Sequence, residues 1–112
     1  MSQRLEKINE LIHHKLSEII SKELEFPINS LVTITRVETS PDIKYGKVYI
    51  SVLPDNMRGS CLKIFKKNSH RLHKILKKEM LTKFTPNLKF LIDEQEIFAT
   101  KVENLLDEIN KG

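Results

Sequence analysis

Residues 61–81 read CLKIFKKNSHRLHKILKKEML, a helical pattern with a fault in its middle. The apolar face that starts at Leu62 resumes after the fault at helical spacing. Between the two halves stand Asn68 and Ser69, polar residues that form helices only moderately well. A continuous helix would turn them toward the core, whereas a local break lets their side chains bond the freed backbone groups. The stretch therefore predicts two helices joined by a kink at Asn68, Ser69 and His70.

Upstream of this stretch the sequence predicts one helix and a hairpin of two strands. In residues 4–24 apolar side chains recur at spacings of three and four, which is the period of one buried helix face, and Pro27 ends the helix. Residues 31–37 are rich in β-branched side chains, and in residues 47–52 Val48, Ile50 and Val52 alternate with Lys47, Tyr49 and Ser51. The turn residues Ser-Pro-Asp at 40–42 separate the two runs, so we expect them to pair antiparallel.

The remaining elements follow two further breaks in the pattern. Residues 54–60 form the first break, and Ser60 is the expected N-cap of the helix that follows it. After Pro86, residues 88–92 alternate like a third strand, and residues 98–109 carry apolar side chains at helical spacing. The expected fold class is α+β, with helices packed on one three-stranded sheet, in a single domain spanning residues 1–112.

Composition narrows the class of protein further. The chain has 112 residues, of which 39% are hydrophobic and 30% charged, enough for one packed core. Its single cysteine, Cys61, excludes an intramolecular disulfide and fits a reducing compartment. The sequence has neither an apolar run of membrane-spanning length nor the apolar core of a signal peptide. We therefore expect a monomeric domain of the cytoplasm, without a membrane partner.

The positive charge is concentrated in one segment. Residues 58–89 hold ten basic residues and one acidic residue, a net charge of +9, whereas the rest of the chain is net −5. Such a segment favours a polyanion, because like charges on one helix face repel each other until an anion lies between them. The candidate RNA-binding residues are Arg58, Lys63, Lys66, Lys67, His70, Arg71, Lys74, Lys77, Lys78 and Lys83, with Lys67, Arg71, Lys74 and Lys78 at spacings that form one stripe. A solvated lysine-rich helix, or one that faces an acidic protein, is the alternative.

The sequence offers little that points to catalysis. His70 and His73 are three residues apart, but no acidic residue or cysteine nearby completes a metal site. Cys61 would need a histidine base brought to it by the fold, and a buried inert thiol is the commoner case. The three glycines stand too far apart for a phosphate-binding loop. We expect no enzymatic activity, no metal and no cofactor.

Four blocks of sequence resemble bacterial ribosome-binding factor A. They are VTITRVETSPDI at residues 32–43, GKVYISVL at 46–53, PNLKFLID at 86–93, and a closing valine and leucine pair at 102–106. The blocks occur in the order and at the spacing of that family. The resemblance implies a type II KH-like domain without catalytic activity that binds the small ribosomal subunit and its 16S rRNA late in assembly. It also implies a part in processing that rRNA and in growth in the cold.

The family marks the kink between its two helices with alanine, any residue, then glycine. These positions fall on Asn68, Ser69 and His70, so neither the alanine nor the glycine is kept. We expect Asn68 to take the left-handed conformation in place of the missing glycine. The family's arginine after the kink falls at His73, with Arg71 as a substitute two residues earlier. A ribosome hibernation factor remains an alternative with the same charge pattern.

Overall fold

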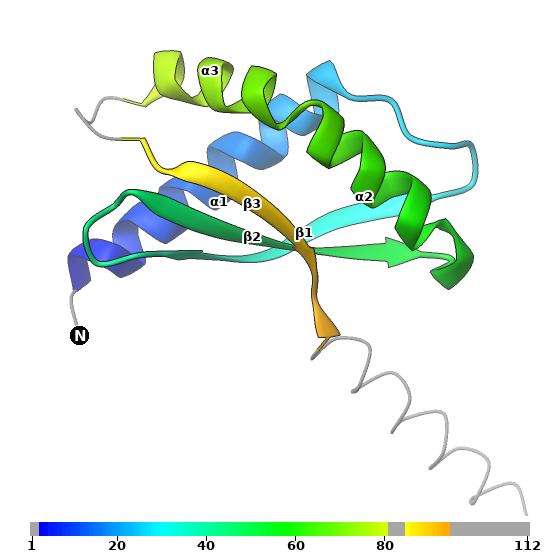
Figure 1. The fold of residues 1–112 in the computed structure, drawn as a ribbon, viewed down its shortest axis with the longest axis horizontal. Helices are drawn as coiled ribbons and strands as arrows, with labels where there is room; N and C mark the ends of the chain where they lie inside the picture. The colour runs from blue at the N-terminus through cyan, green and yellow to red at the C-terminus, as the bar shows by residue number, and fades with distance from the viewer. Residues whose placement is uncertain (1–2, 81–84, 95–112) are drawn as a thin grey trace, which may run out of the picture.

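Helices cover one face of a three-stranded sheet in the computed structural model, which describes residues 3–80 and 85–94 (Figure 1). In chain order the elements are α1 (Gln3–Glu23), β1 (Leu31–Thr39), β2 (Tyr45–Leu53), the short 3-10 helix η1 (Asp55–Met57), α2 (Arg58–Lys67), α3 (Ser69–Glu79) and β3 (Asn87–Ile92). α1 packs on β1, α2 lies over β2 and β3, and α3 lies against α1 and β3. The predicted α+β class and the helix break are confirmed.

The central strand of the sheet is β2. It pairs antiparallel with β1, where Ile34 lies opposite Ile50, and parallel with β3, where Ile92 lies opposite the same residue. A Cβ atom on Gly46 of β2 would lie 3.3 Å from the ring of Pro86, so glycine permits the close approach of the two strands at this point. The predicted hairpin and third strand are both confirmed.

Phe65 of α2 lies at the centre of the core. Its ring stacks on Phe90 of β3 at a centroid distance of 4.9 Å and lies 5.3 Å from Phe26, which follows α1. The other residues of the core come from the three α-helices, from the helix-facing side of β1 and β2, and from the residue after α3: Ile12, Leu16, Ile19, Ile20, Ile34, Val37, Val48, Ile50, Val52, Cys61, Leu72, Leu76 and Met80. Burial of one apolar face per element therefore fixes where α2 and α3 lie on the sheet.

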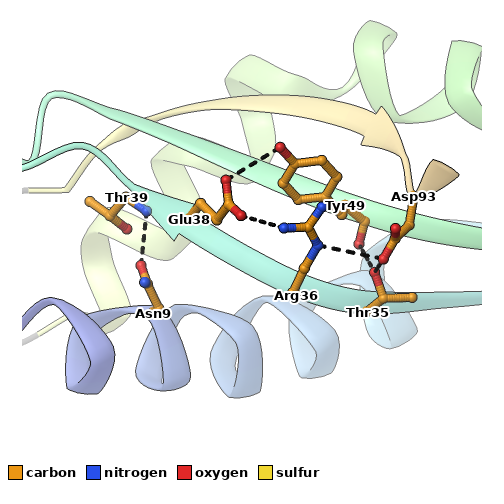
Figure 2. A network of polar contacts seen from close by, with 7 residues as sticks. All are labelled: Asn9, Thr35, Arg36, Glu38, Thr39, Tyr49 and Asp93. Atoms are coloured by element: carbon orange, nitrogen blue, oxygen red, sulfur yellow. Dashed lines mark hydrogen bonds and ion pairs between the residues drawn. The ribbon is translucent and has the colours of Figure 1, made fainter. Parts of the chain in front are cut away.

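Two side chains of α1 form hydrogen bonds with the backbone of β1. His13 Nε2 donates to the carbonyl oxygen of Ile34 at 2.8 Å. The backbone N–H of Thr39 donates to Asn9 Oδ1 at 2.9 Å (Figure 2). These polar contacts lie at two points along the strand. They set the register of α1 on the sheet, which apolar packing alone defines less sharply.

A bulge in β1 and the end of β3 form a polar network on the side of the sheet away from the helices (Figure 2). Thr35 is the extra residue of the bulge, and its hydroxyl donates to Asp93 Oδ2 at 2.5 Å. Arg36 Nε lies 3.6 Å from the same oxygen, and its guanidinium stacks 3.8 Å from the centre of the Tyr49 ring. Arg36 also pairs with Glu38. The network joins the chain just after β3 to the other two strands, and Asp93 is buried within it.

The expected N-cap at Ser60 is wrong. Ser60 is not an N-cap, because α2 begins at Arg58, where η1 runs directly into it, and Ser60 therefore lies inside the helix. The helix expected over residues 98–109 lies outside the described residues. No helix within residues 3–80 or 85–94 is long and apolar enough to cross a membrane.

Candidate nucleic-acid interface

α2 and α3 meet at a corner above the sheet (Figure 1). α2 ends at Lys67 and α3 begins at Ser69, so Asn68 alone joins the two helices. Asn68 Nδ2 donates to the carbonyl oxygen of Ile64 at 2.8 Å, and Ser69 Oγ donates to that of Lys66 at 3.0 Å. The polar side chains at the fault thus bond backbone groups near the end of α2, as predicted. These bonds stabilise the corner locally.

The backbone at the corner differs from the sequence-based expectation. Asn68 has φ −102° and ψ 7°, in the bridge region next to the right-handed helix, and not in the left-handed region. The bridge region redirects the chain between two helices without positive φ. A glycine is therefore not required at this corner, which explains how asparagine can stand there.

Six lysines on the two helices are exposed: Lys63, Lys66 and Lys67 on α2, and Lys74, Lys77 and Lys78 on α3. Within the described residues none of the six has an ion-pair partner. His70 is exposed as well, on the first turn of α3. The predicted stripe is divided by the corner, because Lys67 ends α2 while its other members lie on α3. Lys83 lies outside the described residues.

The two arginines of the predicted set differ from the lysines, since each has a carboxylate partner. Arg58 Nη2 lies 2.8 Å from Asp55 Oδ1 and its side chain is only 28% exposed. Arg71 Nη2 contacts the carboxylate of Glu23 and donates to the Glu23 carbonyl oxygen at 3.1 Å. The spacing of Asp55 and Arg58 on one turn could have been noticed in the sequence. Glu23 lies 48 positions from Arg71, and no local signal links them.

His73 and Cys61 have structural roles. His73 is half-buried and its Nε2 lies 3.4 Å from the carbonyl oxygen of Thr85, which ties α3 to the segment before β3. Cys61 is fully buried, and burial raises the pKa of its thiol. Burial and a raised pKa both disfavour the thiolate, the form in which a cysteine acts as a nucleophile. Within the described ranges, no three His, Cys, Asp or Glu side chains gather into a group that could hold a metal ion.

The order of elements, the mixed sheet and the helix pair that meets at a short corner define a type II KH-like domain. The chain belongs to the ribosome-binding factor A family: the sequence model of that family matches residues 4–106. Ribosome-binding factor A of Coxiella burnetii (strain RSA 493 / Nine Mile phase I) is 31% identical over 111 residues, which cover 99% of this chain and 93% of the relative. The protein of the same name from Lachnoclostridium phytofermentans is 35% identical over 108 residues, 95% of this chain and 79% of the relative.

Solved structures agree with this assignment. The crystal structure of ribosome-binding factor A from Thermus thermophilus matches with a TM-score of 0.69 at 24% identity, over 79% of this chain and 93% of the other. A homology model of the Thermus thermophilus protein, fitted into a cryo-electron microscopy map of its complex with the 30S subunit, has a TM-score of 0.64 at 25% identity, over 74% of this chain and 88% of the other. The predicted fold and the resemblance to this family are confirmed.

The position that the family resemblance gave to an arginine is not free for binding here. His73 is half-buried and turned toward Thr85, so the residue at this position packs against the domain. Arg71, the expected substitute, is half-exposed on the first turn of α3 but is paired with Glu23. The charge available at the corner therefore comes mainly from lysines.

Proposed function

We propose that this protein binds the small ribosomal subunit through the phosphates of its 16S rRNA and assists the late maturation of that rRNA, without catalysing a reaction. The family supports a ribosome-binding role, and the Thermus thermophilus relative has been fitted into a 30S complex. Rapid growth in the cold would then depend on this protein, and its place of action would be the cytoplasm.

The observation that carries the proposal is the group of six exposed lysines without ion-pair partners in the described residues, placed on both sides of the α2–α3 corner. Lysine ammonium groups contact phosphates without reading base sequence, so they supply affinity and orientation. The residues outside 58–89 are net −5, which directs the molecule toward RNA with this surface first.

The test is sucrose-gradient sedimentation of the tagged protein, with parent and variants compared at equal concentration. Replacing Lys67, Lys74 and Lys78 by Glu should move the protein from the small-subunit fractions to the top of the gradient. A matched control replaces Lys7, Lys44 and Lys47, which are exposed on α1 and the β1–β2 hairpin, and it should co-sediment like the parent. Loss in the control alone, or in neither variant, would refute the assignment of this surface.

The same gradient separates the other functions that the charge pattern allows. An assembly factor should be found on free and immature small subunits and should leave them as processing ends. A hibernation factor would persist on mature subunits and whole ribosomes, and a module for an acidic protein would stay off ribosomes altogether. Accumulation of unprocessed 16S rRNA in a deletion strain at low temperature would support the maturation role.

A further inference from the structure

Among the described residues, Arg71 is the one exposed arginine at the α2–α3 corner. Its guanidinium already forms an ion pair with Glu23 of the same chain. Its Nη2 contacts both the carboxylate and the carbonyl oxygen of Glu23, and its Nη1 lies 3.5 Å from Asn68 Oδ1. The side chains of Arg71 and Glu23 are 50% and 38% exposed, so solvent and ligands reach both partners. The contact therefore lies on the proposed RNA-binding surface and not beneath it.

Glu23 is an unexpected residue at its position. It is the last residue of α1, where the negative end of the helix dipole disfavours a carboxylate. Arg71 offsets this field, so the pairing benefits both partners. A planar guanidinium binds a carboxylate and a phosphate with the same donor groups. Glu23 thus occupies the place on Arg71 that a phosphate of RNA would take.

We propose that Glu23 is a specificity-determining residue of the RNA-binding surface. Its carboxylate keeps loosely bound polyanions from contacting the Arg71 guanidinium, and it is displaced only by a phosphate positioned at the corner. This inference rests on the proposed function. The six lysines can bind any polyanion, because within the described residues none of them forms an ion pair with a carboxylate. Arg71 contributes to binding only where a phosphate displaces Glu23. Exchange is feasible because exposed ion pairs are weak.

The experiment measures binding of the full chain to purified small subunits and to poly(U) over a series of salt concentrations. Glu23→Gln removes the charge but leaves an amide oxygen that can still accept from Arg71, so the fold is expected to persist. Glu25→Gln is the matched control, since Glu25 is also exposed and carries the same charge two residues away, without an ion-pair partner in the described part of the chain.

In Glu23→Gln we expect poly(U) affinity to rise about two- to fivefold at low salt. The slope of log K against log salt should steepen by about 0.7, as for one further phosphate contact on a single strand. Subunit affinity should rise less, so the preference for subunits over poly(U) should fall. The double variant Glu23→Gln with Arg71→Gln should return poly(U) binding to the level of the parent.

Two results would overturn the inference: Glu23→Gln behaving like Glu25→Gln on both ligands, or a gain in poly(U) binding that persists when Arg71 is also replaced. The lysine variant of the gradient experiment separates this failure from failure of the proposed function. If replacing Lys67, Lys74 and Lys78 abolishes subunit binding while Glu23→Gln changes nothing, only the role of Glu23 is wrong. If the lysine variant still binds subunits, the proposed surface itself is wrong.

Discussion

The side-chain amide of Asn68 donates to the carbonyl oxygen of Ile64 at 2.8 Å, and the backbone N–H of Asn68 approaches the same oxygen at 3.2 Å. One acceptor of α2 therefore receives both donors of a single residue. In a continuous helix this carbonyl would receive only the backbone donor. The second bond holds the side chain of Asn68 against the end of α2 and leaves the next residue to start α3.

The first prediction concerns this corner. Replacing Asn68 and Ser69 together by Ala removes both side-chain bonds and inserts two strong helix formers, so α2 and α3 should merge into one straighter helix. Subunit binding should fall because the lysines of the two helices lose their mutual orientation, while the domain stays folded. The measurement is a thermal melt paired with gradient sedimentation.

Ser60→Ala is the control for that pair of substitutions, because Ser60 is exposed inside α2. It should leave both readouts close to the parent. If the double variant binds small subunits as the parent does, the break is a packing irregularity, and the functional interpretation of residues 68–70 is wrong.

The second prediction is the salt dependence of subunit binding. If the lysine surface contacts about five phosphates, log K should fall with log salt at a slope of roughly −3.5 to −4.5. Replacing Lys74 by Gln should make the slope shallower by about 0.7 to 0.9. Binding that is insensitive to salt would show that apolar or base contacts dominate, contrary to the proposal.

The third prediction compares two glycines. Gly59→Ala should stabilise the domain by about 0.5–1 kcal/mol, because Gly59 is exposed within α2 and an added Cβ meets no atom within 4 Å. Gly46→Ala should destabilise it by about 1–2 kcal/mol, because the added Cβ would lie 3.3 Å from the buried ring of Pro86. Urea unfolding at one temperature checks both, and equal signs for the two variants would contradict the packing described here.

The fourth prediction is a pH effect in the β1–β2 turn. A hydrogen bond from the Ser40 hydroxyl, followed by one from the backbone N–H of Lys44, lowers the pKa of Asp42 below its usual value of 3.8. A carboxyl whose pKa is lower in the folded state adds stability above the unfolded pKa and loses it as pH falls through the folded pKa. Ser40→Ala should therefore reduce the loss of stability below about pH 4.

Urea midpoints between pH 2 and pH 6 measure this difference. Ser17→Ala, at an exposed position of α1, is the control and should keep the acid dependence of the parent. Identical acid dependence in Ser40→Ala and the parent would show that the turn contributes nothing to it.

The elements could be predicted because each follows from a local pattern. The stripe of α1, the alternation in β2 and the polar fault at Asn68 each concern residues that are close in sequence. Ser60 was the exception, because sequence alone does not show that η1 continues directly into α2. The left-handed conformation expected for Asn68 was wrong because a glycine in relatives does not fix the backbone of another residue.

The contacts that could not be predicted join residues that are distant in sequence. The pairing of Arg71 with Glu23 requires the end of α1 to lie beside the start of α3, which only the folded core determines. Likewise, the place of Asp93 beside Thr35 depends on the bulge in β1, and no local pattern indicated an extra residue there. Charge and exposure of the lysines were predictable, and the spacing of Asp55 and Arg58 pointed to their pairing, whereas the pairing of Arg71 with Glu23 was not predictable.

The parallel pairing of β2 with β3 has a consequence for the order of folding. The whole of α2 and α3 lies between two neighbouring strands, and paired residues such as Tyr45 and Asn87 are 42 positions apart, so the segment that carries the exposed lysines is closed only by β3. Phe65 of α2 stacks on Phe90, a residue that the ribosome synthesises after all six exposed lysines of α2 and α3. Such non-local contacts form slowly, because the entropy of closing the loop is lost before they are gained. A nascent chain therefore has α2 and α3 before it has β3, the strand that both helices contact, and Phe65 gains its stacking partner only when Phe90 has emerged.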